Sequence, residues 1–221
     1  MIISRAHRFV FVHIPKTGGT ALALALEARA ARNDILIGDT PKARARKDRL
    51  RGVKTAGRLW KHSTLCDVAG LLSPQEMETF FVFTLVRNPW DRMVSYYHWL
   101  RAQGFGHPAV GLAKTLDFAA FLQHPVIRTA IAMAPYGAYL RDPGGVDRGR
   151  LYARLEHLAE DLVPLEAHLS RHLPLIPRVN ASDRTRDWRG YYTDATAALV
   201  GTLCAEDIAR FGYGFDDPVP V

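Results

Sequence analysis

Two short stretches of the sequence carry residues whose types and spacing suit the binding of a charged group. The first contains a lysine and two threonines around a pair of glycines: Lys16, Thr17, Gly18, Gly19 and Thr20. Glycine N–H groups at the start of a helix, backed by the helix dipole, bind phosphate or sulfate groups. The lysine adds a positive charge, and the threonines add hydroxyl donors. The stretch therefore predicts an oxyanion site, and the competing interpretation is a tight turn that contains two glycines.

The second stretch begins at Arg87, directly after the apolar run 80–86. Open α/β sheets bind ligands at the carboxyl ends of their strands, where this arginine is expected. Ser95 lies about one helical turn beyond Asp91, so its hydroxyl can face back toward Arg87. A guanidinium and a hydroxyl together make a compact phosphate clamp. In the alternative interpretation, Arg87 pairs with Asp91 and only braces the turn.

The elements that must position these residues alternate between strand and helix. Strands are predicted at residues 9–14, 35–37, 80–86 and 151–155, and helices at residues 21–31, 65–72, 91–101, 116–123, 159–172 and 193–210. Ser73-Pro74 is expected to end the helix over 65–72. The alternation predicts an α/β class with a mainly parallel central sheet flanked by helices.

Length and composition exclude several classes of protein. The 221 residues are 48% hydrophobic and 23% charged, which predicts a folded chain with a single domain over residues 1–221. Two cysteines, Cys66 and Cys204, are too few for a disulfide framework and are expected to be buried thiols. No apolar run approaches the roughly 20 residues of a membrane helix. Residues 1–8 show no apolar core of signal-peptide length, and we expect a cytoplasmic protein with no transmembrane segment.

The two stretches also carry a family resemblance. Residues 13–20 resemble the 5′-phosphosulfate loop of sulfotransferases, and residues 87–97 resemble their 3′-phosphate motif. The branch that the chain resembles includes carbohydrate O-sulfotransferases of the heparan 2-O and chondroitin type. Lys61-His62-Ser63 is similar to that branch, as are residues 155–158 and 207–215 near the end of the chain.

The resemblance implies a P-loop NTPase-like fold and a donor, 3′-phosphoadenosine 5′-phosphosulfate (PAPS), which leaves as 3′-phosphoadenosine 5′-phosphate (PAP). Lys16, Thr17, Gly18, Gly19 and Thr20 would hold the 5′-phosphosulfate, and Arg87 and Ser95 the 3′-phosphate. The loop from Asn180 to Arg186 would close over the adenine or the 3′-phosphate. The sulfuryl group would pass to an acceptor hydroxyl, on a carbohydrate or glycoconjugate, without a metal. Lys16 would also be catalytic, because it can stabilise the leaving phosphate.

The acceptor hydroxyl must lose a proton, and histidine is the natural base near neutral pH. Among nine histidines, the resemblance selects His62, although spacing alone also allows a surface or structural role. His13 is expected to brace the loop, and His98 is a weaker candidate for the base. His168 and His172 have the i, i+4 spacing of zinc ligands, but no third ligand is evident, and no metal is expected.

Two other functions compete with sulfuryl transfer. A P-loop kinase or NTPase would need Gly-Lys-Ser/Thr at the end of its loop and an acidic metal partner, and the sequence offers neither. A nucleic-acid-binding module would use the Lys- and Arg-rich stretch 42–61. No recognised nucleic-acid-binding motif accompanies this stretch, so no nucleic acid is expected as a partner. Four aromatic residues can stack on a sugar ring or pack in the core: Trp60, Trp99, Tyr96 and Tyr97.

The net charge of +7 comes from one segment. Residues 38–62, which we call the basic segment, hold nine Lys or Arg against two Asp, and the rest of the chain is balanced. We expect a mobile or weakly helical surface segment that attracts or covers an anionic acceptor, such as an acidic glycan, or closes over the donor. The alternative is a solvated flexible loop.

Overall fold

The computed structural model describes residues 1–174, 176 and 184–219. The chain divides into two compact units, one of Met1–Val86 with Tyr136–Asn180 and one of Arg87–Pro135 with Ala181–Val221. The first unit contains the sheet, and the described elements of the second are helical. The single domain over residues 1–221 stays a prediction.

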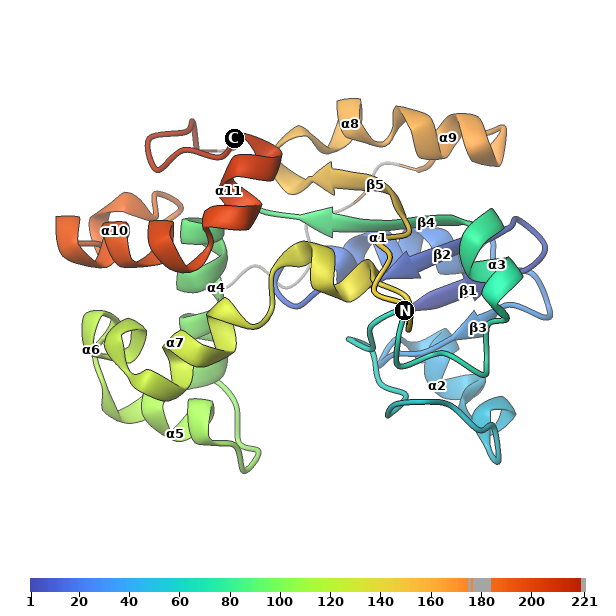
Figure 1. The fold of residues 1–221 in the computed structure, drawn as a ribbon, viewed down its shortest axis with the longest axis horizontal. Helices are drawn as coiled ribbons and strands as arrows, with labels where there is room; N and C mark the ends of the chain where they lie inside the picture. Colours follow the sequence, from blue (N-terminus) through green and yellow to red (C-terminus); the bar gives the residue numbers. More distant parts are fainter. Residues whose placement is uncertain (175, 177–183, 220–221) are drawn as a thin grey trace. The chain divides into compact units, whose positions relative to one another are not determined.

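The first unit is built on a five-stranded sheet (Figure 1). In hydrogen-bonded order, its strands are β3 (Ile35–Leu36), β1 (Ile2–Ser4), β2 (Phe9–Val12), β4 (Phe81–Val86) and β5 (Gly149–Arg154). β2 is parallel to β4, and β4 to β5, whereas β1 is antiparallel to both of its neighbours. In this sheet β1 alone runs against the other strands, which confirms the predicted α/β class with a mainly parallel sheet.

Apolar side chains on the central strands explain how the sheet is covered. Side chains alternate across a strand, so the paired residues Phe11 and Phe83 point to the same face, with ring centroids 5.3 Å apart. Leu22 of α1 and Leu165 of α9 belong to the same buried cluster. The helical segments of this unit are α1 (Gly19–Ala28), α2 (Pro41–Ala45), η1 (Lys47–Leu50), α3 (Pro74–Thr79), η2 (Tyr136–Leu140), η3 (Leu155–His157), α8 (Leu158–Asp161) and α9 (Val163–Leu169).

The second unit is organised around the helix that follows Arg87. Its elements are α4 (Pro89–Arg101), α5 (Pro108–Thr115), α6 (Phe118–Gln123), α7 (Pro125–Ala132), η4 (Arg189–Tyr191), α10 (Asp194–Leu203) and α11 (Ala205–Phe211). Asn88 caps α4 by accepting a hydrogen bond from the Trp90 N–H. The Trp90 indole donates to the Ala197 carbonyl at 2.9 Å, which ties α10 to the start of α4.

The predicted helix over 65–72 is wrong, because this segment forms turns and one isolated bridge, between Ala69 and Leu72. Ser73-Pro74 begins a helix instead of ending one. The Ser73 hydroxyl accepts from the Glu76 N–H, and the Glu76 carboxylate accepts from the Ser73 N–H, which forms a complete capping box for α3. Although the segment is not helical, three of its apolar residues are buried: Leu65, Val68 and Leu72. The spacing of these residues therefore reflects their burial and not a helix.

Other boundaries also differ from the sequence predictions. The helix predicted over 159–172 is two helices, with Pro164 in the first turn of α9, and the helix predicted over 193–210 is divided at Cys204. β1, α5 and α7 were not predicted. Cys66 is exposed, whereas Cys204 is buried, and burial raises the pKa of the Cys204 thiol to about 12.

Candidate functional site

The glycine-rich loop joins the end of β2 to the start of α1 in the first unit. The Thr84 hydroxyl of β4 donates to the carbonyl of Val12, the last residue of β2, at 2.7 Å. Beyond this point the backbone turns sharply, since Lys16 and Gly18 have φ angles of 66° and 80°. Glycine adopts such angles freely, whereas a lysine with a positive φ is strained by roughly 1 kcal/mol or more. Lys16 therefore occupies a backbone position that is energetically unfavourable for a residue other than glycine.

The start of α1 presents N–H donors that have no partner in the described part of the chain. Gly18 is the N-cap residue and supplies no side-chain cap, and the first turn holds no acidic residue. Among the described residues, the N–H groups of Gly18, Gly19 and Thr20 have no hydrogen-bond partner. The Thr17 hydroxyl is buried and donates to the Ile14 carbonyl at 3.0 Å, so it braces the loop. Free N–H groups at a helix N-terminus are the donors that an oxyanion requires.

Both glycines are packed against neighbouring side chains. A Cβ at Gly19 would lie 2.4 Å from Cδ2 of His13, and a Cβ at Gly18 would lie 2.7 Å from Cδ1 of Leu155. Leu155 belongs to one of the segments that resemble the sulfotransferase tail, so a residue of this segment packs against the loop. His13 is buried beneath Gly19, which agrees with the prediction that it braces the loop.

His62 is held at the same strand end. Its Nδ1 lies 2.7 Å from the carbonyl oxygen of His13. A carbonyl can only accept, so Nδ1 carries the hydrogen, and a neutral His62 has its lone pair on Nε2. The two imidazole rings meet edge to face with centroids 4.9 Å apart. The predicted base and the predicted oxyanion loop are therefore neighbours.

The electrostatics keep both histidines neutral. Burial lowers the pKa of His62 to about 4, and the hydrogen bond to His13 only partly offsets this effect. Burial also lowers the pKa of His13 well below 6.5, and the proximity of His62 adds to that shift. At neutral pH, His62 is thus unprotonated and able to accept a proton at Nε2.

A small turn fixes the backbone that carries His62. The buried Ser63 hydroxyl accepts from the Trp60 N–H and lies 2.9 Å from the carbonyls of Arg58 and Trp60. Lys61 extends to Asp39, with Nζ 2.7 Å from Oδ2, and does not point a free charge at the site. The serine of the Lys61-His62-Ser63 pattern therefore has a structural role.

The four aromatic residues that could stack on a sugar differ in their exposure and in their contacts. Trp60 is 46% exposed, and its ring meets the His62 ring with centroids 5.0 Å apart. Tyr97 is buried, and its hydroxyl donates to the Leu116 carbonyl. Tyr96 and Trp99, which stack on each other in the second unit, are half-buried. Trp60 is the one of the four that is both exposed and in contact with the candidate base.

The second unit contains a buried row of charges at the start of α4. Arg87 donates to Oδ2 of Asp91 from both Nε and a terminal nitrogen, at 2.8 and 2.6 Å. Arg184 donates to the other oxygen of Asp91. Their side chains are 7–13% exposed. The pairing of Arg87 with Asp91 is thus present, and Asp91 bridges the two guanidinium groups.

The other predicted residues of this unit lie nearby in the chain. Ser95 is buried on α4, one turn after Asp91. His98 has a lowered pKa because of burial, and its Nε2 has no hydrogen-bond partner among the described residues. Of the loop from Asn180 to Arg186, residues 180–183 lie outside the described part of the chain. Arg184, the first residue described after that gap, was not singled out by sequence reasoning.

The pair with zinc-ligand spacing makes separate contacts. His168 lies 2.8 Å from the His7 carbonyl, and His172 lies 2.8 Å from the Glu166 carboxylate. Over the described ranges, no group of three or more His, Cys, Asp or Glu is arranged to hold a metal ion. Within the same ranges, no helix has the length and apolarity to cross a membrane.

Comparison with known proteins concerns the fold and the family of the chain. Of the solved structures, the crystal structure of mouse sulfotransferase SULT7A1 complexed with PAP has a TM-score of 0.54 and 17% sequence identity. The match covers 95% of this chain and 87% of the mouse chain, and at this identity it concerns the fold. No curated protein matches the chain. A model of the sulfotransferase family matches residues 1–116, more than half of the sequence, so the chain belongs to the sulfotransferase family.

Proposed function

We propose that this sulfotransferase moves a sulfuryl group from PAPS to a hydroxyl group on a carbohydrate or glycoconjugate. One observation carries the proposal. The unpaired N–H groups at the start of α1 and the neutral imidazole of His62 are both held by His13, through its side chain and its carbonyl. An oxyanion site beside a base is the arrangement that transfer to a hydroxyl requires.

The loop residues fit the 5′-phosphosulfate of the donor. The N–H groups of Gly18, Gly19 and Thr20 would bind its oxygens, and the Lys16 ammonium would stabilise the charge that develops on the leaving phosphate. When bound, the donor supplies an activated sulfuryl group attached to that phosphate. The buried Thr17 hydroxyl would keep the loop in shape and not contact the donor.

The base would be His62. Because Nδ1 donates to the His13 carbonyl, the free Nε2 would accept the proton of the acceptor hydroxyl as that oxygen bonds to sulfur. The imidazolium would then be held by the same hydrogen bond until it returns the proton to solvent.

For the 3′-phosphate we propose Arg87 and Ser95, joined by Arg184. Asp91 holds both guanidinium groups in place, and guanidinium groups bind phosphate with paired N–H donors. Support comes from the resemblance of residues 87–97 to the 3′-phosphate motif and from the PAP bound to the mouse protein.

The carbohydrate acceptor is proposed on the basis of Trp60. A pyranose ring presents C–H groups on its face, and these pack well on the electron-rich face of an indole. An exposed indole in contact with the base would place a sugar hydroxyl near Nε2. The cytoplasmic location is likewise a proposal, which rests on the sequence alone.

Replacing Lys16 tests the role of the loop in catalysis. Lys16→Gly keeps the positive φ without strain, so we expect the thermal midpoint to change little while kcat falls roughly a hundredfold or more. The measurement is sulfate transfer from PAPS to a panel of saccharide acceptors. Lys16→Arg, which keeps the charge, should retain more activity than Lys16→Gly. Equal kcat in the wild type and Lys16→Gly would refute the assigned role.

Changing His62 to asparagine tests the base. The Asn side chain can still donate to the His13 carbonyl but cannot take up a proton, so we expect kcat to fall by roughly 10²–10⁴-fold. PAP affinity, measured by calorimetry, should stay within a factor of two or three, because His62 is not among the donor's proposed ligands. A variant with wild-type kcat would exclude His62 as the base.

The lowered pKa of His62 predicts an unusual pH profile. With a pKa of about 4, the base stays neutral down to pH 5, so kcat/KM should be nearly flat from pH 8 to 5. An enzyme whose base has the ordinary pKa of about 6.5 would lose activity more than tenfold between pH 7 and 5.

The lowered pKa of His62 also makes unfolding easier in acid, because between pH 6.5 and 4 the unfolded chain binds more protons than the folded chain. Circular dichroism at each pH separates unfolding from titration, and a steep fall of kcat/KM between pH 7 and 6 in folded protein would contradict the assignment.

Removing the Trp60 ring tests the carbohydrate acceptor. Trp60→Ala should raise KM for a saccharide acceptor roughly five- to tenfold and change kcat less, because stacking is lost while the base remains. Trp60→Phe should have a smaller effect. Phe105→Ala is the matched control, since Phe105 is also an exposed aromatic residue, at 48%, but lies in the other unit. The proposal fails if Trp60→Ala and Phe105→Ala have the same KM as the wild type.

A further inference from the structure

Part of the basic segment is docked on the end of α1. Lys42 donates to the carbonyl of Glu27, Arg46 donates to the carbonyls of Ala31 and Asp34, and Arg49 donates to the carbonyl of Arg32. The weakly helical surface segment is therefore found, as α2 and η1, and its mobility stays a prediction. Cations at a helix C-terminus are favoured by the helix dipole.

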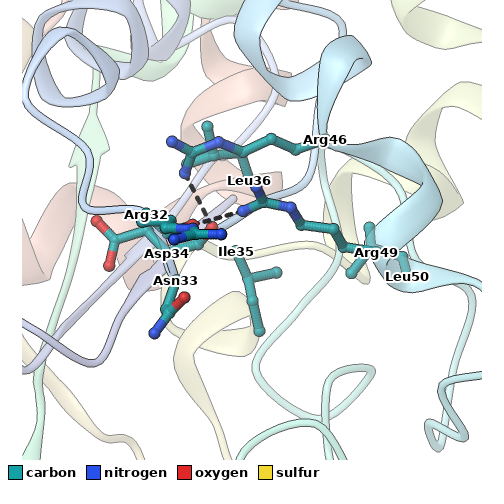
Figure 2. Close-up of a pocket in the computed structure, with 8 residues that line it drawn as sticks. All are labelled: Arg32, Asn33, Asp34, Ile35, Leu36, Arg46, Arg49 and Leu50. Atoms are coloured by element: carbon teal, nitrogen blue, oxygen red, sulfur yellow. Dashed lines mark hydrogen bonds between the residues drawn. The ribbon is translucent and has the colours of Figure 1, made fainter.

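Beside these contacts lies a cavity of 330 Å³ lined by three arginines, Arg32, Arg46 and Arg49 (Figure 2). Figure 2 shows the side chains of Arg46 and Arg49 reaching toward the backbone of residues 32–34. Hydrogen bonds to that backbone hold both guanidinium groups in fixed positions, so a ligand would meet them already ordered. The cavity is large enough for an anionic group together with part of the molecule that carries it.

The charges around the cavity favour an anion. Among the described residues, Arg46 and Arg49 donate from NH1 alone, which leaves their other N–H groups for a ligand, and the Arg32 side chain makes no hydrogen bond or ion pair. Asp34 is the one acidic residue in the lining. Its Oδ2 accepts from the Ala31 N–H, Oδ1 has no partner among the described residues, and Figure 2 shows the carboxylate directed away from Arg46 and Arg49. Three guanidinium groups against one carboxylate leave a net positive site.

This cavity lies far from the glycine-rich loop. The loop precedes α1, whereas Arg32 and Asp34 follow it, and a helix of ten residues is about 15 Å long. The strand β3 also separates the two sites. Asp34, which lines the cavity, precedes this strand. Gly38 follows it and lies against Lys61, the neighbour of His62 in the chain. The cavity and the glycine-rich loop therefore lie at opposite ends of α1.

We propose that the arginine-lined cavity binds an oxyanion, a carboxylate or sulfate group, carried by the acceptor chain at a distance from the hydroxyl that receives the sulfuryl group. The proposal rests on the proposed function. It assigns the acceptor to acidic oligosaccharides long enough to reach from His62 to the far end of α1. Guanidinium groups suit this task because they bind carboxylate and sulfate with paired N–H donors.

Calorimetric titration of the full chain with acidic oligosaccharides of increasing length tests the proposal. The probes are polyuronate disaccharide, tetrasaccharide and hexasaccharide, with inorganic sulfate as the small-anion arm and PAP as the donor arm. The variant Arg32→Gln/Arg49→Gln removes two charges from the cavity. Its matched control, Arg44→Gln/Arg51→Gln, removes two exposed charges of the same segment that do not line the cavity. Thermal midpoints check that both variants fold.

We expect the hexasaccharide to bind the wild type at least tenfold more tightly than the disaccharide or sulfate. The cavity variant should lose that gain, while the control variant keeps it within about twofold. Equal losses in the two variants would show diffuse attraction and overturn the proposal. It would also be overturned if sulfate bound as tightly as the hexasaccharide, which would indicate a free-anion site, or if no oligosaccharide bound. PAP binding separates the two proposals, because its absence would instead contradict the proposed function.

Discussion

The hydrogen bond from His62 Nδ1 to the carbonyl of His13 is the contact on which the candidate site depends. It fixes the tautomer of His62 and so decides which nitrogen can take a proton. The same His13 fills the space beside Gly19 with its ring, and a Cβ there would collide with it. One residue at the end of β2 therefore places a base next to a set of unpaired N–H groups. Because both histidines are buried, they stay neutral, and the site avoids placing two imidazolium charges 4.9 Å apart.

The helix α1 connects this site to the basic segment. Its first turn has no side-chain cap, so its N–H groups and the positive end of its dipole remain available to an oxyanion. At its other end, cations of the basic segment donate to the carbonyl of Glu27 in the last turn and to carbonyls that follow the helix. The charge of the segment thus does more than create a positive surface. Part of it completes the far end of the helix whose near end forms the loop, and part lines the cavity there.

The central strands could be predicted from the sequence, and so could the position of the glycine-rich loop between a strand and a helix. Continuous apolar runs and glycine-rich turns are strong local signals. Prediction from the sequence failed where burial imitates helical spacing, as at Leu65, Val68 and Leu72. It also missed α5 and α7, whose caps are His107 and His124 and not the usual Ser, Thr, Asp or Asn. The arrangement around His62 could not be predicted from spacing, because His13 and His62 are 49 residues apart and meet only through the tertiary fold. The bridging of Arg87 and Arg184 by Asp91 depends on a contact across 93 residues in the same way.

The most direct test of this account is the binding of PAP to the wild-type protein, compared with the binding of ADP. Calorimetry in the presence of a chelator should show PAP binding without a divalent metal ion, at least tenfold more tightly than ADP, because ADP lacks the 3′-phosphate proposed to contact Arg87 and Ser95. ADP binding that equals or exceeds PAP binding and requires magnesium would contradict the account and favour a P-loop kinase or NTPase.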